Sequence, residues 1–243
     1  MDVRNGFIEG IFDYCERWCE TCALTSWCSV FADIAAAEAA LDPSLKAVVE
    51  APPLPQDVPP APANWVQKLI AEATEAASEP LSEEECGQGR LTVAPGHAAI
   101  LARGHAYCGR VHVWLQGRNG FSINDGGDPR AVVGMFRTLI PGKIFRALTM
   151  LERETPEEGD WPADYDGSAK VALLGIERSH VAWLQMADRG LASSAETAPF
   201  IADLVWLGEE LERVFPHARA FVRPAFDEPH EVARMLEAER RRC

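Results

Sequence analysis

The stretch DPRAVVGMFRTLIPGKIFRALTMLERE, residues 128–154, decides the fold class of this chain. Asp128 can accept hydrogen bonds from exposed backbone amides, and Pro129 has the backbone angle of a first helical turn, so a helix is predicted to begin here. Pro141 and Gly142 lie in its middle, and proline cannot donate the backbone hydrogen bond that a helix interior needs. We therefore predict a long helix with a kink or a break near Pro141.

Three other stretches have the same helical character, namely residues 96–117, 166–190 and 198–215. In the second of these, Asp166 or Ser168 is expected to cap the start, and Gly190 is expected to end the helix. Alternation of polar and apolar residues, which is typical of strands, is scarce. We predict an all-α protein in which residues 94–216 form a helical bundle of about four long helices.

The remaining residues divide into shorter parts by composition. Residues 1–50 are predicted to be a Cys-rich helical metal-binding segment, because their second half is rich in Ala, Leu and Glu. A run of prolines marks residues 51–63 as an extended linker, since proline has a fixed backbone angle and lacks an amide donor. Residues 64–93 are predicted to form a short helix and an acidic turn, and residues 217–243 a C-terminal extension.

The most unusual part of the chain is CERWCETCALTSWC, residues 15–28, which holds Cys15, Cys19, Cys22 and Cys28. On a continuous helix the first three would share one face, because they are four and three residues apart. Cys28 would point elsewhere unless the chain turned after Cys22. The spacing therefore predicts two helical turns followed by a bend around a bound metal centre.

All four cysteines are predicted to be metal ligands, and an iron–sulfur cluster is the expected cofactor. Structural zinc sites usually have two short cysteine knuckles with a long spacer between them, whereas iron–sulfur clusters accept compact runs. Zinc is the alternative cofactor. A third interpretation is a buried face of cysteines with no metal, because cysteine is often buried in protein cores.

The run CETCALTSWC, residues 19–28, resembles the iron–sulfur staple of RecB-type nucleases, which include the AddB family. The resemblance implies that Cys19, Cys22 and Cys28 are ligands of the cluster, while the fourth ligand in that family is usually distant in sequence. Cys15 departs from the family arrangement. No carboxylate–lysine motif of a nuclease accompanies the run, so the resemblance implies the cluster and not the nuclease activity.

A second candidate site lies in the predicted bundle. His105 and His112 are expected on the same stripe of their helix as its core leucines. Glu177 and His180 have the Glu-x-x-His spacing of ferritin-like metal sites, but a complete site of that kind needs two such pairs. A metalloenzyme with these four ligands is therefore one interpretation. A structural role, with Glu177 paired to an arginine, is favoured over it.

The predicted bundle also holds four cations, Arg137, Lys143, Arg146 and Lys170, which together with the helix start near residue 166 could bind an anion. Ordinary surface cations are the favoured interpretation of so loose a spacing.

Charge and hydropathy limit the partners and the compartment. The 243 residues have a net charge of −14, which argues against nucleic acid as a partner. The start of the chain lacks the apolar region of a signal peptide, and no apolar run reaches the roughly 20 residues of a membrane span. We expect a cytoplasmic protein whose thiols are reduced.

Three functions fit this sequence. They are an iron–sulfur protein with a structural or electron-transfer role, a helical-bundle metalloenzyme, and a zinc-stapled protein-interaction module. A redox or protein partner suits the first and the third. The sequence indicates neither an enzymatic reaction nor an oligomeric state.

Overall fold

A computed structural model of the chain describes residues 3–41, 93–118, 120–122, 124–152, 164–230 and 232–234. The chain divides into two compact units. The N-terminal unit includes residues 3–12 and 22–41, and the helical unit includes residues 13–21 and 93–234. The predicted linker, residues 51–63, lies outside the described residues, as does nearly all of residues 64–93.

The N-terminal unit begins with a β-hairpin. Strands β1 (Val3–Arg4) and β2 (Phe7–Ile8) pair antiparallel, with Val3 opposite Ile8. Asn5 and Gly6 connect them and both have positive φ, 54° and 81°, as a two-residue type I′ turn requires. Further along the chain, 3-10 helices lie at Ile11–Asp13 and Thr25–Trp27, and helix α1 spans Ser29–Leu41. A third 3-10 helix, Cys19–Thr21, belongs to the helical unit.

The α-helical prediction for the N-terminal segment is therefore wrong as far as residue 28, whereas it is confirmed for Ser29–Leu41. The physical reason is the backbone. Gly10 and Arg17 have φ of 68° and 55°, in the left-handed region, and an α-helix cannot continue through such residues.

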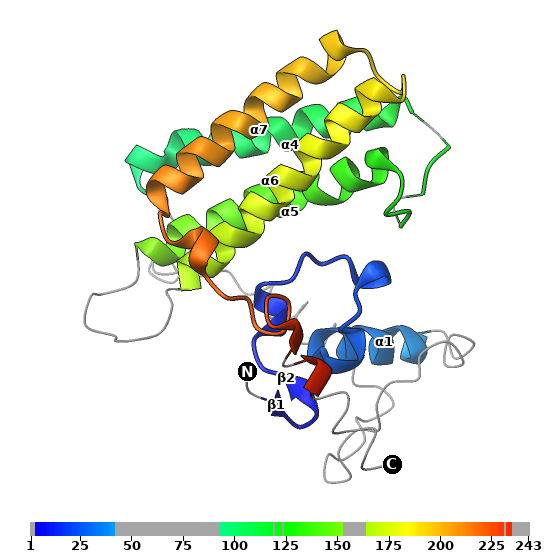
Figure 1. Cartoon of the computed structure of the whole chain (residues 1–243), viewed down its shortest axis with the longest axis vertical. Helices are drawn as coiled ribbons and strands as arrows, with labels where there is room; N and C mark the ends of the chain where they lie inside the picture. Colours follow the sequence, from blue (N-terminus) through cyan, green and yellow to red (C-terminus); the bar gives the residue numbers. More distant parts are fainter. Residues whose placement is uncertain are drawn as a thin grey trace, which may run out of the picture. The chain divides into compact units, whose positions relative to one another are not determined.

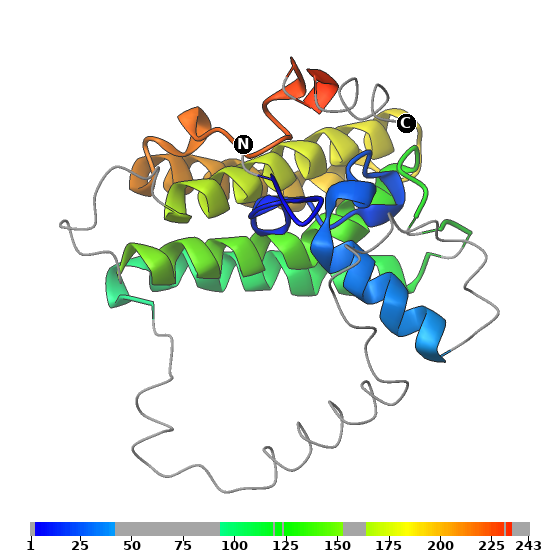
Figure 2. The same ribbon diagram turned by 90° about the horizontal axis from the view of Figure 1, so that it is seen from below.

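Four long helices make up most of the helical unit: α4 (Ala98–Gln116), α5 (Pro129–Leu151), α6 (Asp164–Asp188) and α7 (Ser194–Val214). The chain direction reverses from each helix to the next (Figure 1). Helix α5 packs most extensively on α6, and α4 contacts both α5 and α7. In Figure 2, α4 and α5 lie in one layer and α6 and α7 in the other. The described protein is mostly helical, as predicted.

The helix ends have clear local causes. The side chain of Asp128 accepts a hydrogen bond from the backbone amide of Arg130 at 2.8 Å, which confirms Asp128 as the N-cap of α5. Ser193 and Glu196 form a capping box at the start of α7 that the sequence analysis missed. Gly190 follows α6 with φ of 69°, which confirms it as the residue that ends this helix.

Helix α6 begins earlier than predicted. It starts at Asp164, so Asp166 and Ser168 lie inside its first turns and are buried rather than acting as caps. An ion pair accompanies the earlier start, because a carboxylate oxygen of Asp164 lies 3.0 Å from a guanidinium nitrogen of Arg146 on α5. Burial raises the pKa of Asp166.

Helix α5 continues through Pro141, so the predicted break is wrong. Pro141 is buried, and it faces Gly104 on α4. A Cβ atom at Gly104 would lie 3.5 Å from the Cβ of Pro141 and 3.4 Å from Ile144. The small glycine thus lets α4 approach α5 at the proline, and tertiary packing there offsets the lost backbone hydrogen bond.

The core of the helical unit centres on aromatic side chains. Trp183 of α6 stacks on Phe200 of α7, with ring centroids 4.1 Å apart. Its indole nitrogen donates a hydrogen bond to the hydroxyl of Tyr107 on α4 at 3.1 Å. All three side chains are buried, so one cluster joins three of the four helices.

Residues 13–21 pack against the long helices although they precede them by more than seventy positions. The ring of Trp18 meets Phe136 of α5 edge to face at 6.2 Å, and the ring of Tyr14 lies 4.8 Å from that of Phe221. The hydroxyl of Tyr14 donates to Asp164. Burial and this hydrogen bond raise the pKa of Tyr14, so its hydroxyl stays protonated.

Gly167 of α6 provides the space for Tyr14, and we expect Gly167→Ala to lower the free energy of unfolding by about 1–3 kcal/mol. A Cβ atom at Gly167 would lie 2.6 Å from Cδ1 of Tyr14 and 2.7 Å from Cζ of Phe221. Denaturant unfolding measures the change. Gly109→Ala is the matched control, because a Cβ atom on that exposed helical glycine would meet nothing within 4 Å. The control should gain roughly 0.5–1 kcal/mol. Equal effects of the two substitutions would contradict this packing.

Candidate functional site

The four clustered cysteines lie on a turning backbone rather than on one helix. Cys19 begins the 3-10 helix Cys19–Thr21, and Cys28 directly follows the 3-10 helix Thr25–Trp27. The predicted helical face shared by Cys15, Cys19 and Cys22 is therefore wrong. All four side chains are half-buried. Cys15 and Cys19 belong to the helical unit, and Cys22 and Cys28 to the N-terminal unit.

One cysteine sulfur accepts a backbone hydrogen bond. The amide of Leu24 donates to Sγ of Cys22 at 3.4 Å. Hydrogen bonds of this kind stabilise a thiolate and tune the potential of a bound cluster. Turning backbone and an amide directed at sulfur are features that a metal–thiolate site requires.

In the described ranges, no three His, Cys, Asp or Glu side chains lie close enough together to hold a metal ion. The convergence of Cys15, Cys19, Cys22 and Cys28 on one centre therefore stays a prediction.

The second candidate set is not brought together either. His105 and His112 are exposed on α4, whose buried face carries Ile100, Tyr107, Val111 and Trp114. The prediction that the two histidines face the core is wrong, because the core stripe passes one position away from each of them. His112 instead lies 3.0 Å from the amide nitrogen of Gln116.

On α6, Glu177 is exposed and pairs with Arg219 at 2.6 Å, so the arginine pairing that the sequence favoured is confirmed. His180, three residues further on, is half-buried. The structure therefore gives Glu177 a structural partner in place of a metal.

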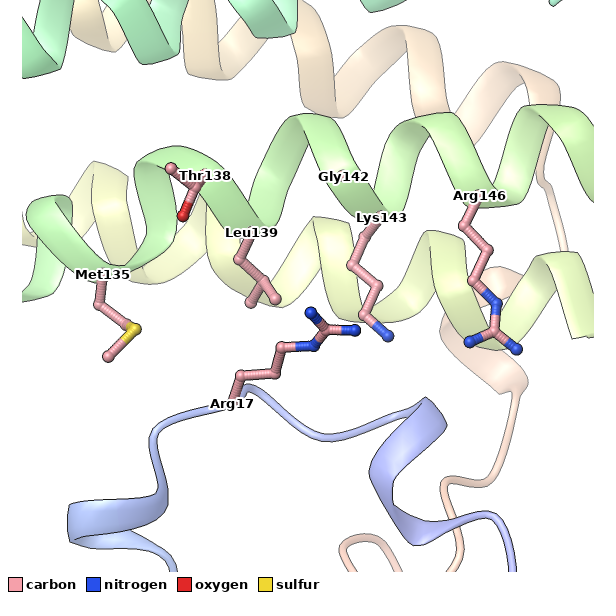
Figure 3. Close-up of a pocket in the computed structure, with 7 residues that line it drawn as sticks. All are labelled: Arg17, Met135, Thr138, Leu139, Gly142, Lys143 and Arg146. Atoms are coloured by element: carbon pink, nitrogen blue, oxygen red, sulfur yellow. The ribbon is translucent and has the colours of Figure 1, made fainter. Parts of the chain in front are cut away.

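A different site lies between residues 13–21 and α5. It is a pocket of about 400 Å³, lined by Arg17, Met135, Thr138, Leu139, Gly142, Lys143 and Arg146 (Figure 3). Arg17 extends from its loop towards the ammonium of Lys143, and Arg146 follows one turn along α5. The side chains of Met135 and Leu139 form the apolar end of the same pocket.

The three cations of this pocket differ in their partners. Arg146 pairs with Asp13 at 2.6 Å and with Asp164 at 3.0 Å. Lys143 is only 3% exposed and donates to the neutral backbone carbonyl of Asp13. Within the described part of the chain, Arg17 makes no ion pair with a carboxylate. The pocket therefore carries an excess of positive charge in a strongly acidic protein.

The pKa of Lys143 reflects this environment. It is lowered from the ordinary 10.5 to about 8, first by burial and then by the like charges of Arg146 and Arg17. The charges of Cys15 and Asp13 oppose the shift.

The sequence singled out Lys143 and Arg146 but missed Arg17, which lies 126 positions before Lys143. Lys170, the fourth cation considered with them, is occupied elsewhere, because its ammonium binds the carboxylate of Asp227 at 2.7 Å. No pattern in the sequence indicated that Arg17 lies beside α5, because residues 13–21 were predicted to belong to a separate segment.

Comparisons with known proteins do not indicate a function, so a functional proposal must rest on the geometry of the sites. No family model, no curated protein and no solved structure matches the chain. Among the described helices, none has the length and apolar character needed to cross a membrane.

Lys143→Met is expected to raise the free energy of unfolding at pH 7 by about 1–3 kcal/mol, because it removes a buried charge whose hydrogen-bond acceptor is the neutral carbonyl of Asp13. The pH dependence of this difference follows from the number of protons that each state binds. Between pH 8 and 10.5 the unfolded chain binds the lysine proton more tightly, so the wild type gains stability as the pH rises through this window. The advantage of the variant should be full below pH 8 and should shrink towards pH 10.5. Denaturant unfolding at several pH values measures it, and a pH-independent difference would contradict the burial of this charge.

Proposed function

We propose that this protein binds a metal centre, most simply an iron–sulfur cluster, through Cys15, Cys19, Cys22 and Cys28. The role of the cluster is structural or electron-transferring. The observation that carries the proposal is the turning cysteine segment with an amide of Leu24 directed at Sγ of Cys22. The resemblance of residues 19–28 to the cluster staple of RecB-type nucleases supports the same cofactor.

The backbone supports convergence better than the predicted helix would. On a helix Cys28 would point away from the other three thiols. The left-handed Arg17 and the 3-10 helices at Cys19–Thr21 and Thr25–Trp27 turn the chain repeatedly within fourteen residues. A chain that turns in this way can wrap a bulky cluster, as compact iron–sulfur ligand runs do.

The surroundings of the thiols fit the proposal as well. Cys15 interacts electrostatically with Lys143 on α5. The half-buried state of all four thiols suits a centre that is shielded from water and still reachable for assembly.

Zinc is the second candidate. The hydrogen bond from the amide of Leu24, two residues after Cys22, is equally suited to a small tetrathiolate zinc knuckle. With zinc, the segment would serve as a staple for a protein-interaction module and would have no redox role.

We further propose that α4 to α7 form an up-down-up-down four-helix bundle, supported by their alternating directions and their shared core (Figure 1). A reducing compartment such as the cytoplasm fits a chain with seven cysteines, and a redox or protein partner fits an electron-transfer role.

The test is anaerobic purification followed by a visible absorption spectrum, with iron, zinc and acid-labile sulfide assayed on the same sample. A brown protein with iron and sulfide is expected. One zinc without colour would replace the cluster with the zinc staple. The absence of both metals would contradict the proposal.

Cys22→Ser and Cys28→Ser are each expected to lose most of the bound metal, because a missing thiolate leaves the centre with an incomplete ligand set. Cys108→Ser is the matched control, since Cys108 is also a half-buried thiol but lies on α4. It should keep the metal content of the wild type. Full metal retention in both Cys22→Ser and Cys28→Ser would contradict the assignment of these ligands.

A further inference from the structure

The pocket between residues 13–21 and α5 is chemically distinct from a thiolate centre. We propose that it binds a small organic phosphate, with the phosphate held between Arg17 and Lys143 and the apolar part of the ligand against Met135 and Leu139. This inference does not rest on the proposed metal centre.

The charges of the pocket favour an anion. Arg146 is already matched by Asp13 and Asp164, whereas among the described residues neither Arg17 nor Lys143 forms an ion pair with a carboxylate. Two like charges placed together repel each other, and an anion between them relieves that repulsion. A net charge of −14 makes such a concentration of cations the more distinctive.

The burial of Lys143 also favours a bound anion. Lysine is almost never as buried as Lys143 unless its charge is paired, yet the acceptor of this ammonium is a neutral carbonyl. The other charged groups acting on Lys143 are Arg146, Arg17, Cys15 and Asp13. A bound phosphate would supply a counter-charge in direct contact.

The donor groups of Arg17 and Lys143 suit a phosphate. A guanidinium offers a planar fork of N–H groups and an ammonium offers a compact point charge, and both are common ligands of phosphate oxygens. In Figure 3 the ends of Arg17 and Lys143 converge in the pocket. Arg17 reaches it from a left-handed backbone, with φ of 55°, which long side chains rarely adopt.

The size of the pocket suits a small organic ligand. The volume of about 400 Å³ lies within the range of small-molecule sites and exceeds what a phosphate alone would fill. Gly142 keeps it open, because a Cβ atom there would meet nothing within 4 Å. Met135 and Leu139 lie one helical turn apart and supply the apolar wall. The remaining space therefore suits an organic group attached to the phosphate.

Phenyl phosphate is a suitable probe, with inorganic phosphate and phenol as its two halves. Titration calorimetry on the full-length protein should give saturable binding of phenyl phosphate, weaker binding of inorganic phosphate and none of phenol. A wild-type protein that does not bind phenyl phosphate at millimolar concentrations would overturn the proposal.

Three variants locate the binding. Arg17→Gln and Lys143→Met should each weaken the affinity for phenyl phosphate at least about tenfold, as expected for the loss of a charge-assisted contact. Gly142→Leu should also abolish binding, because it fills the pocket while leaving every cation in place. Gly109→Leu is its matched control, another helical glycine with open space around it, and should bind like the wild type. Unchanged affinity in Arg17→Gln and Gly142→Leu would mean adventitious binding elsewhere and would overturn the proposal.

Two further measurements distinguish a loss of phosphate binding from unfolding and from a loss of metal. Lys143→Met is expected to be more stable than the wild type, so unfolding would not explain its loss of binding. Cys22→Ser should bind phenyl phosphate even where it carries no metal, so the two proposals fail independently. If Arg17→Gln releases metal and leaves the affinity for phenyl phosphate unchanged, the cations serve the cysteines and the phosphate site is overturned.

Discussion

The attachment of residues 13–21 to the long helices is the interaction on which the rest of the helical unit depends. Tyr14 fills the space above Gly167, Trp18 meets Phe136, and Asp13 pairs with Arg146. Packing and ion pairing at the same short segment hold it against α5 and α6. Without this attachment the cationic pocket would lack Arg17, and Lys143 would lose the carbonyl of Asp13.

The two candidate sites place opposite demands on the protein. A thiolate centre concentrates negative charge, whereas the pocket holds two cations, Arg17 and Lys143, that form no ion pair with any carboxylate in the described part of the chain. Lys143 illustrates the energetic cost, since its burial lowers its pKa to about 8. A side chain that destabilises the fold and is nevertheless present is more readily explained by binding than by packing.

Much of the helical fold could be predicted from local signals, because caps, prolines and glycines act over a few residues. Asp128 and Gly190 were predicted correctly on that basis. The break at Pro141 was not, because the residue that accommodates it, Gly104, lies on another helix. The histidines of α4 were assigned to the core because they have the spacing of one helical face. The core residues have the same spacing, and spacing alone does not show which face of the helix is buried.

The cysteine spacing pointed to a metal, but the Asn5–Gly6 hairpin turn and the left-handed Arg17 were overlooked, so the segment was mistaken for a helix. The pocket was beyond prediction because it joins residues more than a hundred positions apart.

The attachment of residues 13–21 also decides which parts of the chain form one folding unit. The helical unit is not a contiguous stretch of sequence. A fragment beginning at residue 93 would retain all four long helices and yet present the apolar surfaces around Gly167 and Phe136 to water. The boundary of this folding unit therefore cannot be drawn with a single cut.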